Sequence, residues 1–205
     1  MHVIILKTCK FNLKGYNTFK LIKMNEVDIM IDIETLSTNP NALILTIAAI
    51  KFDRSYSIKP IDQMECFYKR ISKASGKKLN MHIDENTRKW WKEQDKEVQY
   101  EALYNKNDRI DLADALKELS QFIKGSNCVW SHGDDFDCVI LSEAFKTCKI
   151  EIPWKFWQTR DTRTLFDIAK LNYNKEIPIS KNHHALYDCY RQIIGVKNCL
   201  EKLQY

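Results

Sequence analysis

The stretch of sequence that decides the fold is VDIMIDIE, residues 27–34. Residues 27–33 form an apolar run rich in β-branched side chains, which is typical of a buried strand. Residues 43–52 form a second apolar run, and residues 66–71 alternate between apolar and polar side chains. Together the three segments predict a three-strand meander at the start of the domain.

Helical periodicity follows the meander. Asp84 is placed to cap a helix that contains Trp90 and Trp91. A short strand over residues 128–131 ends near Gly133 and leads into another helix. The remaining predicted helices lie within residues 96–104, 112–122, 136–145 and 186–203. Three strands followed by alternating helices and strands predict an α/β domain with a mixed β-sheet.

The size and hydrophobicity of the chain predict one compact domain. Its 205 residues are 44% hydrophobic, which is enough to bury a sizeable core. The longest apolar stretch, residues 42–50, is far shorter than the roughly 18 residues that suggest a membrane span. We therefore expect no association with a membrane.

The net charge of +5 is concentrated at the N-terminus. Residues 1–23 contain five lysines and no acidic residue. Removing these five from the 32 basic residues leaves 27, which equals the number of acidic residues. We expect residues 1–23 to be a basic appendage that need not belong to the fold, and residues 24–205 to form a single domain. Because that domain is neutral, its overall charge does not identify its partner.

Seven cysteines are spread over apolar stretches without a C-x-x-C pair. An odd number without paired spacing predicts free thiols, and hence a cytoplasmic or other reducing intracellular compartment. Cys128, His132 and Cys138 suggest a zinc site as an alternative, but a fourth ligand at suitable spacing is missing.

The first chemical signal is the pair Asp32 and Glu34 at the end of the first predicted strand. Residues two apart in a strand point to the same side, so the two carboxylates converge. Carboxylates this close repel each other unless a cation lies between them, and oxygen ligands suit Mg²⁺ or Mn²⁺. The same D-x-E pattern at Asp95 and Glu97 lies in a polar stretch typical of a solvated helix face.

Two further acidic positions follow predicted turns. Asp137 falls in the first turn of a helix, where the helix dipole favours a carboxylate that can also reach a metal. Near the start of the last helix, His183 precedes Asp188 by five residues. Helical residues five apart face different ways, so we expect His183 to lie in the preceding loop and Asp188 on the helix. His132 and Asp137 show the same spacing, but their neighbours favour the later pair.

Taken in order, these motifs resemble those of the DEDDh (DnaQ-like) 3′-to-5′ exonucleases, whose fold is ribonuclease-H-like. Within them the likeness is closest to DexA-type phage exonucleases and related bacterial 3′-to-5′ exoribonucleases, over residues 25–200. The motifs that carry it are DIETL (32–36), TRKWWKEQ (87–94), Trp130, Gly133, FD (136–137), RDTRTL (160–165) and HHAL (183–186). Ser37, where such enzymes often have Gly, and Tyr187, where they commonly have Asp, depart from the pattern.

The resemblance implies a ribonuclease-H-like mixed β-sheet flanked by helices and two-metal hydrolysis of single-stranded DNA or RNA from its 3′ end. It implies that two divalent ions, Mg²⁺ or Mn²⁺, are held by Asp32, Glu34, Asp137 and Asp188, with Asp32 bridging them. His183 would be the general base, a role that its near-neutral pKa suits. His184 is the fallback base because it stands four residues before Asp188.

Substrate contacts are expected at four more positions. By resemblance, Thr35 and Leu36 hold the terminal nucleotide through a backbone contact and an apolar wedge. Arg160 and Arg163 could clamp phosphates, or form plain surface pairs with acids. Of the adjacent Trp90 and Trp91, one is expected in the core, which leaves one to stack on bases.

Two other functions compete with an exonuclease. One is a catalytically inactive nucleic-acid-binding module on the same fold, and the other is a phosphohydrolase that acts on nucleotides. A buried acidic cluster argues against the inactive module, because a scaffold alone gives no reason for it. The choice between DNA and RNA stays open, as does a homodimer.

Overall fold

The computed structural model describes residues 27–55, 57–177 and 183–204. The expected appendage at residues 1–23 and the expected start of the domain at Met24 lie outside the described residues. The expectation that they are separate from the fold therefore stays a prediction.

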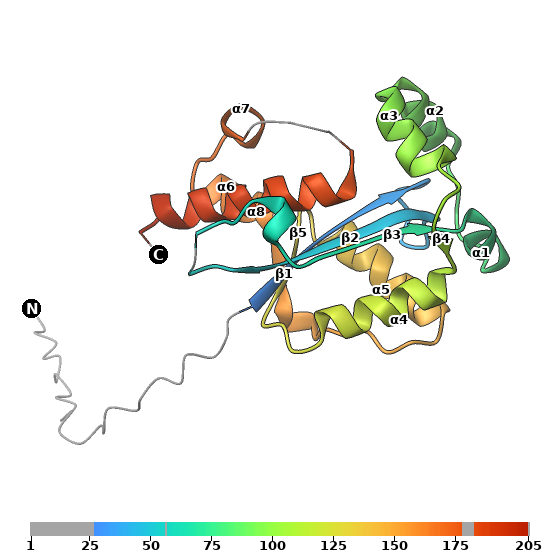
Figure 1. The fold of residues 1–205 in the computed structure, drawn as a ribbon, viewed down its shortest axis with the longest axis horizontal. Helices are drawn as coiled ribbons and strands as arrows, with labels where there is room; N and C mark the ends of the chain where they lie inside the picture. Colours follow the sequence, from blue (N-terminus) through green and yellow to red (C-terminus); the bar gives the residue numbers. More distant parts are fainter. Residues whose placement is uncertain (1–26, 56, 178–182, 205) are drawn as a thin grey trace, which may run out of the picture.

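A mixed six-stranded sheet forms the centre of the molecule, with the strand order β4-β3-β2-β1-β5-β6 (Figure 1). β1, β2 and β3 pair antiparallel, which confirms the predicted meander. β5 runs parallel to β1, β6 parallel to β5 and β4 parallel to β3. The strands are β1 (Val27–Thr35), β2 (Ile44–Asp53), β3 (Cys66–Ile71), β4 (Arg109–Ile110), β5 (Val129–Ser131) and β6 (Thr159–Asp161).

The helices are α1 (Lys73–Lys78), α2 (Glu85–Glu93), α3 (Lys96–Gln99), α4 (Leu112–Ile123), α5 (Asp137–Thr147), α6 (Thr162–Ile168), α7 (Tyr173–Glu176) and α8 (Ala185–Lys202). The helices observed at α4, α5 and α8 match the long helical patterns predicted over residues 112–122, 136–145 and 186–203. Asp84 is the N-cap of α2, as expected, and its carboxylate accepts a hydrogen bond from the amide of Thr87 at 2.7 Å. The helix predicted over residues 96–104 differs in its second half, because α3 continues as a π-helical turn, η2 (Tyr100–Tyr104).

Two apolar cores cover the two faces of the sheet. α4 and α5 pack on one face, and α6 and α8 pack on the other (Figure 1). In β1, Ile29 and Ile31 belong to the first core, whereas Met30 belongs to the second. Because strand side chains alternate between faces, Asp32 and Glu34 lie on the same face as Met30, toward α8.

Three elements meet at the carboxyl end of β1. α8 packs along β1 and β2. α2 is tied to β1 by the indole of Trp91, which donates to the carbonyl of Thr35 at 2.8 Å. Over the residues that the structure describes, no helix combines the length and apolar character needed to cross a membrane.

Candidate active site

Three carboxylates converge where β1 meets the start of α8. β1 supplies Asp32 and Glu34, and the first turn of α8 supplies Asp188. One oxygen from each lies within 4.8 Å of the others. Glu34 is 9% exposed, and the other two are partly buried. Two sequence motifs separated by more than 150 residues therefore form one cluster, as the patterns predicted.

Asp137 lies beside this cluster. It is the first residue of α5 and is 3% exposed, and its Oδ1 accepts a hydrogen bond from the amide of Ile33 at 3.1 Å. Its oxygens fall outside the three-residue cluster, but its side chain lines the same cleft. The structure thus brings Asp137 to the site while directing one oxygen to the backbone of β1.

Burial and mutual repulsion dominate the electrostatics. Burial raises the pKa of Asp32 and Glu34 well above the ordinary range, and the charges of Asp137 and Asp188 raise both further. Burial also raises the pKa of Asp137 to about 8, and it raises the pKa of Asp188. Within the described part of the chain, no lysine or arginine forms an ion pair with Asp32 or Glu34. A buried, oxygen-only cluster of this kind fits a divalent cation such as Mg²⁺.

His183 lines the cleft beside these carboxylates. Its backbone is left-handed, with φ of 59°, and its ring meets that of Trp90 edge to face with 4.7 Å between centroids. Burial lowers the pKa of His183, and the charge of Asp188 acts in the opposite direction. Its place before α8 agrees with the expectation that it belongs to the preceding loop.

His184 is held differently. It is the N-cap residue of α8, and its ring stacks on Tyr68 with 5.1 Å between centroids. It also packs edge to face on Tyr187. His183 lines the cleft whereas His184 does not, so the geometry favours His183 over the fallback base.

The cleft has a volume of about 1120 Å³ and opens between β1, α2 and α8. Besides the acidic residues and His183, it is lined by Thr35, Trp90 and Arg163. Trp91 is 1% exposed and Trp90 is 39% exposed, which confirms that one of the pair is in the core. Trp90 is therefore the tryptophan with a face available to a ligand.

Two predicted substrate-binding residues do not reach this lining. Leu36 is 7% exposed within the first core, and its amide and carbonyl bond to the carbonyl of Leu43 and the amide of Asp84. Leu36 thus makes these contacts within the protein, and its role in substrate binding stays a prediction. Arg160 is exposed, and its guanidinium donates to the carbonyls of Trp157 and Thr159, each at 2.8 Å. One nitrogen of the guanidinium, Nη1, is thus bonded to neighbouring backbone.

The alternative zinc site is excluded because its predicted ligands lie apart in the fold. Cys128 belongs to the second core, whereas Cys138 packs in the first core on the opposite face of the sheet. His132 instead pairs through Nδ1 with the hydroxyl of Thr162 at 2.8 Å. Among the described residues, Asp32, Glu34 and Asp188 form the one group of side chains close enough to hold a metal ion.

Sequence patterns missed several polar residues of the site. Gln192 is 3% exposed and donates from Nε2 to Oδ1 of Asp32 at 2.8 Å. It stands four residues after Asp188, and that helical spacing is the signal that could have found it. Asp161 caps α6 and also accepts the amide of Gly133 at 3.0 Å, so it joins two loops at the edge of the cleft.

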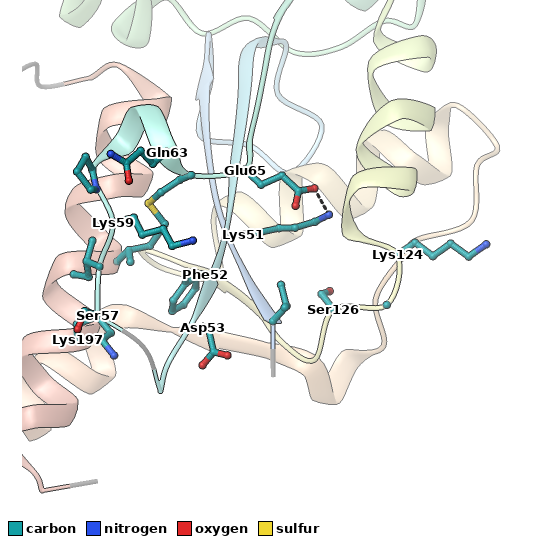
Figure 2. Close-up of a pocket in the computed structure, with 16 residues that line it drawn as sticks. Lys51, Phe52, Asp53, Ser57, Lys59, Gln63, Glu65, Lys124, Ser126 and Lys197 are labelled. Atoms are coloured by element: carbon teal, nitrogen blue, oxygen red, sulfur yellow. Dashed lines mark hydrogen bonds and ion pairs between the residues drawn. The ribbon is translucent and has the colours of Figure 1, made fainter. Parts of the chain in front are cut away.

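A second hollow lies away from the acidic cluster (Figure 2). It is bounded by the end of β2, the segment after it and the loop that precedes β5. Phe52 and Met64 contribute apolar surface, and Lys51 is paired with Glu65. None of the predicted site residues lines it, so this hollow is separate from the predicted site.

A family model described as a 3′-5′ exoribonuclease Rv2179c-like domain matches residues 27–200. The chain belongs to this family. Among curated proteins, an exodeoxyribonuclease of Enterobacteria phage T4 is 24% identical over 208 residues, which cover 84% of this chain and 88% of the phage protein. Both matches agree with the resemblance drawn from the motifs, and they place this family member among 3′-to-5′ exonucleases.

Solved structures share the fold. The zinc-bound complex of E. coli exonuclease I with single-stranded DNA superposes with a TM-score of 0.62 at 16% identity, over 88% of this chain and 41% of the other. The chain thus spans about two fifths of the length of exonuclease I. Exonuclease X in complex with 5′-overhanging duplex DNA gives a TM-score of 0.52 at 15% identity, over 87% and 93% of the two chains. The ribonuclease-H-like fold is therefore confirmed for this exonuclease family member.

Proposed function

We propose that this protein hydrolyses phosphodiester bonds from the 3′ end of a single-stranded nucleic acid with the help of two divalent metal ions, Mg²⁺ or Mn²⁺. The observation that carries the proposal is the cluster of three carboxylates within 4.8 Å in an open cleft. A cluster of this kind is unstable without positive charge, and no cationic side chain of the described residues pairs with Asp32 or Glu34.

The carboxylates have distinct roles in this proposal. Asp32, Glu34 and Asp188 would hold the ions, and Asp137 would support them from the edge of the cluster. Divalent ions bound there would supply an activated water and would stabilise the departing 3′ oxygen. The amide of Gly133 donates to Asp161 and so ties down the loop after β5, and all four carboxylates line the cleft.

His183 would accept the proton of the attacking water. It lines the cleft, and burial lowers its pKa while the charge of Asp188 acts against that lowering, so the net lowering keeps the imidazole neutral and able to accept a proton near neutral pH. Trp90 supports the ring of His183 from α2. His184 is a poor candidate for the same role because its ring is stacked on Tyr68.

Three cleft residues are suited to bind the substrate. Thr35 lines the cleft directly after the acidic pair, and the exposed face of Trp90 offers a platform for a base. Arg163 lies beside Gly133, where an added Cβ would come within 2.9 Å of its guanidinium. We propose that Arg163 contacts a phosphate near the scissile bond.

The choice between RNA and DNA needs a direct comparison. The family model is described as an exoribonuclease domain, whereas the phage relative is an exodeoxyribonuclease. Recognition of a 2′-hydroxyl depends on a few polar groups, so one fold can serve either substrate.

The test uses matched DNA and RNA oligonucleotides that carry a 5′ label, with Mg²⁺ or with a chelator. We expect a ladder shortened from the 3′ end, only in the presence of metal. Glu34→Gln should abolish it, and Glu97→Gln is the control because Glu97 belongs to the exposed second copy of the D-x-E pattern. Binding without degradation would instead support the inactive module, and release of phosphate from nucleotides alone would support the phosphohydrolase.

A further inference from the structure

Gln192 is a buried amide in contact with the acidic cluster. Its side chain lines the cleft, is 3% exposed and donates from Nε2 to Oδ1 of Asp32 at 2.8 Å. Gln192 follows Asp188 by four residues in α8, so the amide and the carboxylate lie on the same helix face one turn apart. α8 therefore supplies both a carboxylate to the cluster and a hydrogen-bond donor to the carboxylate on β1.

The other end of the amide has no compensating contact. Oε1 of Gln192 is buried and lacks a hydrogen-bond partner within the described residues. The orientation follows from chemistry when Asp32 binds a metal ion, because a metal-binding carboxylate is ionised, only accepts hydrogen bonds and must meet the nitrogen. An apolar side chain of the same length would serve packing better, since a buried acceptor without a partner lowers stability. The bond to Asp32 is thus the feature that an amide provides at this position.

The neutrality of the donor also matters. A lysine or arginine in contact with Asp32 would bring a positive charge to the carboxylates of β1 and would compete with a metal ion. The amide orients the carboxylate and leaves its negative charge in place. The neighbouring Arg191 behaves differently, because its guanidinium lies 3.5 Å from the carboxylate of Asp188.

We propose that Gln192 is a positioning residue that holds Asp32 in the orientation in which it binds metal, and that it thereby sets the metal affinity of the site. The proposal rests on the metal site of the proposed function. Residues that orient metal ligands by hydrogen bonds typically change metal affinity by about 10- to 100-fold when they are replaced. Gln192→Met removes the donor at nearly constant length, so it isolates this contribution.

The experiment measures Mn²⁺ binding by electron paramagnetic resonance in the full chain, without nucleic acid. Gln192→Met should weaken Mn²⁺ binding by about 10- to 100-fold. The matched control is Gln99→Met, because Gln99 is also a buried amide, 4% exposed, but it donates to the carbonyls of Lys92 and Gln94. Unchanged affinity in Gln192→Met, or an equal loss in Gln99→Met, would overturn the proposal.

A third variant separates this proposal from the proposed function. If Asp188→Asn weakens Mn²⁺ binding and Gln192→Met does not, only the role of Gln192 fails. If Asp188→Asn has no effect, the metal site fails and the role of Gln192 fails with it. Nuclease assays should show a higher Mg²⁺ requirement for Gln192→Met with an unchanged KM for the oligonucleotide and recovery at saturating metal.

A measurement on the unmodified protein covers the case in which Gln192→Met does not fold. In a crystal structure with Mn²⁺ bound, the amide of Gln192 should remain within hydrogen-bonding distance of Asp32 while Asp32 ligates the ion. Separation of the two side chains, or an ion bound without Asp32, would overturn the proposal.

Discussion

Two aspartates on the same face of β1 show how surroundings determine the role of a carboxylate. Asp28 is completely buried, pairs with Nε of Arg54 at 2.9 Å and accepts the indole of Trp130 at 2.7 Å. Asp32, four residues along the strand, receives a neutral amide and faces three other carboxylates. Asp28 is therefore a structural acid with its own counter-ion, and Asp32 is suited to receive an external cation.

This contrast predicts opposite effects for two similar substitutions. Asp28→Asn should lower the free energy of unfolding by about 3 to 5 kcal/mol, because it removes the negative charge from the buried ion pair with Arg54. Asp32→Asn should raise the stability of the metal-free protein, because it removes a carboxylate whose ionisation is opposed by burial and by its acidic neighbours. Urea denaturation in the presence of a chelator measures both values.

Activity distinguishes the same two variants. Asp32→Asn should have no detectable nuclease activity, whereas the folded fraction of Asp28→Asn should keep its affinity for Mn²⁺. Loss of metal binding in folded Asp28→Asn would contradict the division between a structural and a functional acid.

The two adjacent histidines give a second prediction at the scale of single residues. His183→Ala should lower kcat by about 10²- to 10⁴-fold, the usual contribution of a general base, with little change in the KM for the oligonucleotide. His184→Ala should lower kcat far less, because His184 is stacked on Tyr68 outside the lining of the cleft. Single-turnover assays on both variants provide the comparison, and a larger loss in His184→Ala would assign the base to His184.

At the scale of secondary structure, the contact between α8 and α6 fixes where Asp188 and Gln192 stand. Gly195 lies in the interior of α8, and a Cβ added there would come within 2.5 Å of Cζ of Phe166 on α6. The missing side chain lets the two helices approach closely. α8 can therefore lie against the sheet with its first two turns at the acidic cluster.

Gly195→Ala should consequently destabilise the protein, although alanine is the better helix former. The gain in helix propensity is about 1 kcal/mol, whereas overpacking of a filled core costs about 1 to 3 kcal/mol. We expect a lower melting temperature that Phe166→Leu partly restores in the double variant. Thermal denaturation followed by circular dichroism tests this. A more stable Gly195→Ala variant would mean that Phe166 and α6 shift to accept the added methyl group without loss of stability.

Long elements were predictable from sequence because their patterns report burial directly. The β-branched apolar run of β1 predicted the strand, and the two-residue spacing of Asp32 and Glu34 predicted that they converge on one side. α1 was missed because it is a six-residue, lysine-rich helix that contains a glycine. Its stability depends on packing, since an added Cβ at Gly76 would come within 3.0 Å of the side chain of Leu43.

The charged residues of the site were predictable from the sequence, but the neutral residue Gln192 was not. Carboxylates in an apolar strand are conspicuous, whereas Gln192 carries no signal until α8 is placed beside β1. The surroundings of Leu36 were not predictable for a related reason. Its backbone groups bond to Leu43 and Asp84, which are close only in the folded chain.

For the whole molecule, the acidic cluster links folding stability, pH and metal binding. The pKa of Asp137 is raised from its ordinary value of 3.8 to about 8, and the pKa values of Asp32, Glu34 and Asp188 are also raised. In the metal-free protein the folded state therefore holds protons that the unfolded chain releases above its ordinary carboxylate pKa. Proton binding by these carboxylates therefore contributes to the free energy of unfolding at low pH. This contribution is lost as the pH rises from about 4 toward 8.

A bound divalent cation replaces those protons, so its stabilising effect should grow over the same range of pH. With Mg²⁺ at about 100 times its dissociation constant, we expect about 2.7 kcal/mol of stabilisation, or roughly 5 to 10 °C in melting temperature, at pH 8. At pH 6 the same Mg²⁺ concentration should stabilise the protein clearly less, because protons compete for the carboxylates. Melting curves with Mg²⁺ and with a chelator at both values of pH measure the difference. Asp188→Asn should reduce the response to Mg²⁺ at both, and an equal response of the unmodified protein at pH 6 and pH 8 would mean that the carboxylates are already ionised before the metal binds.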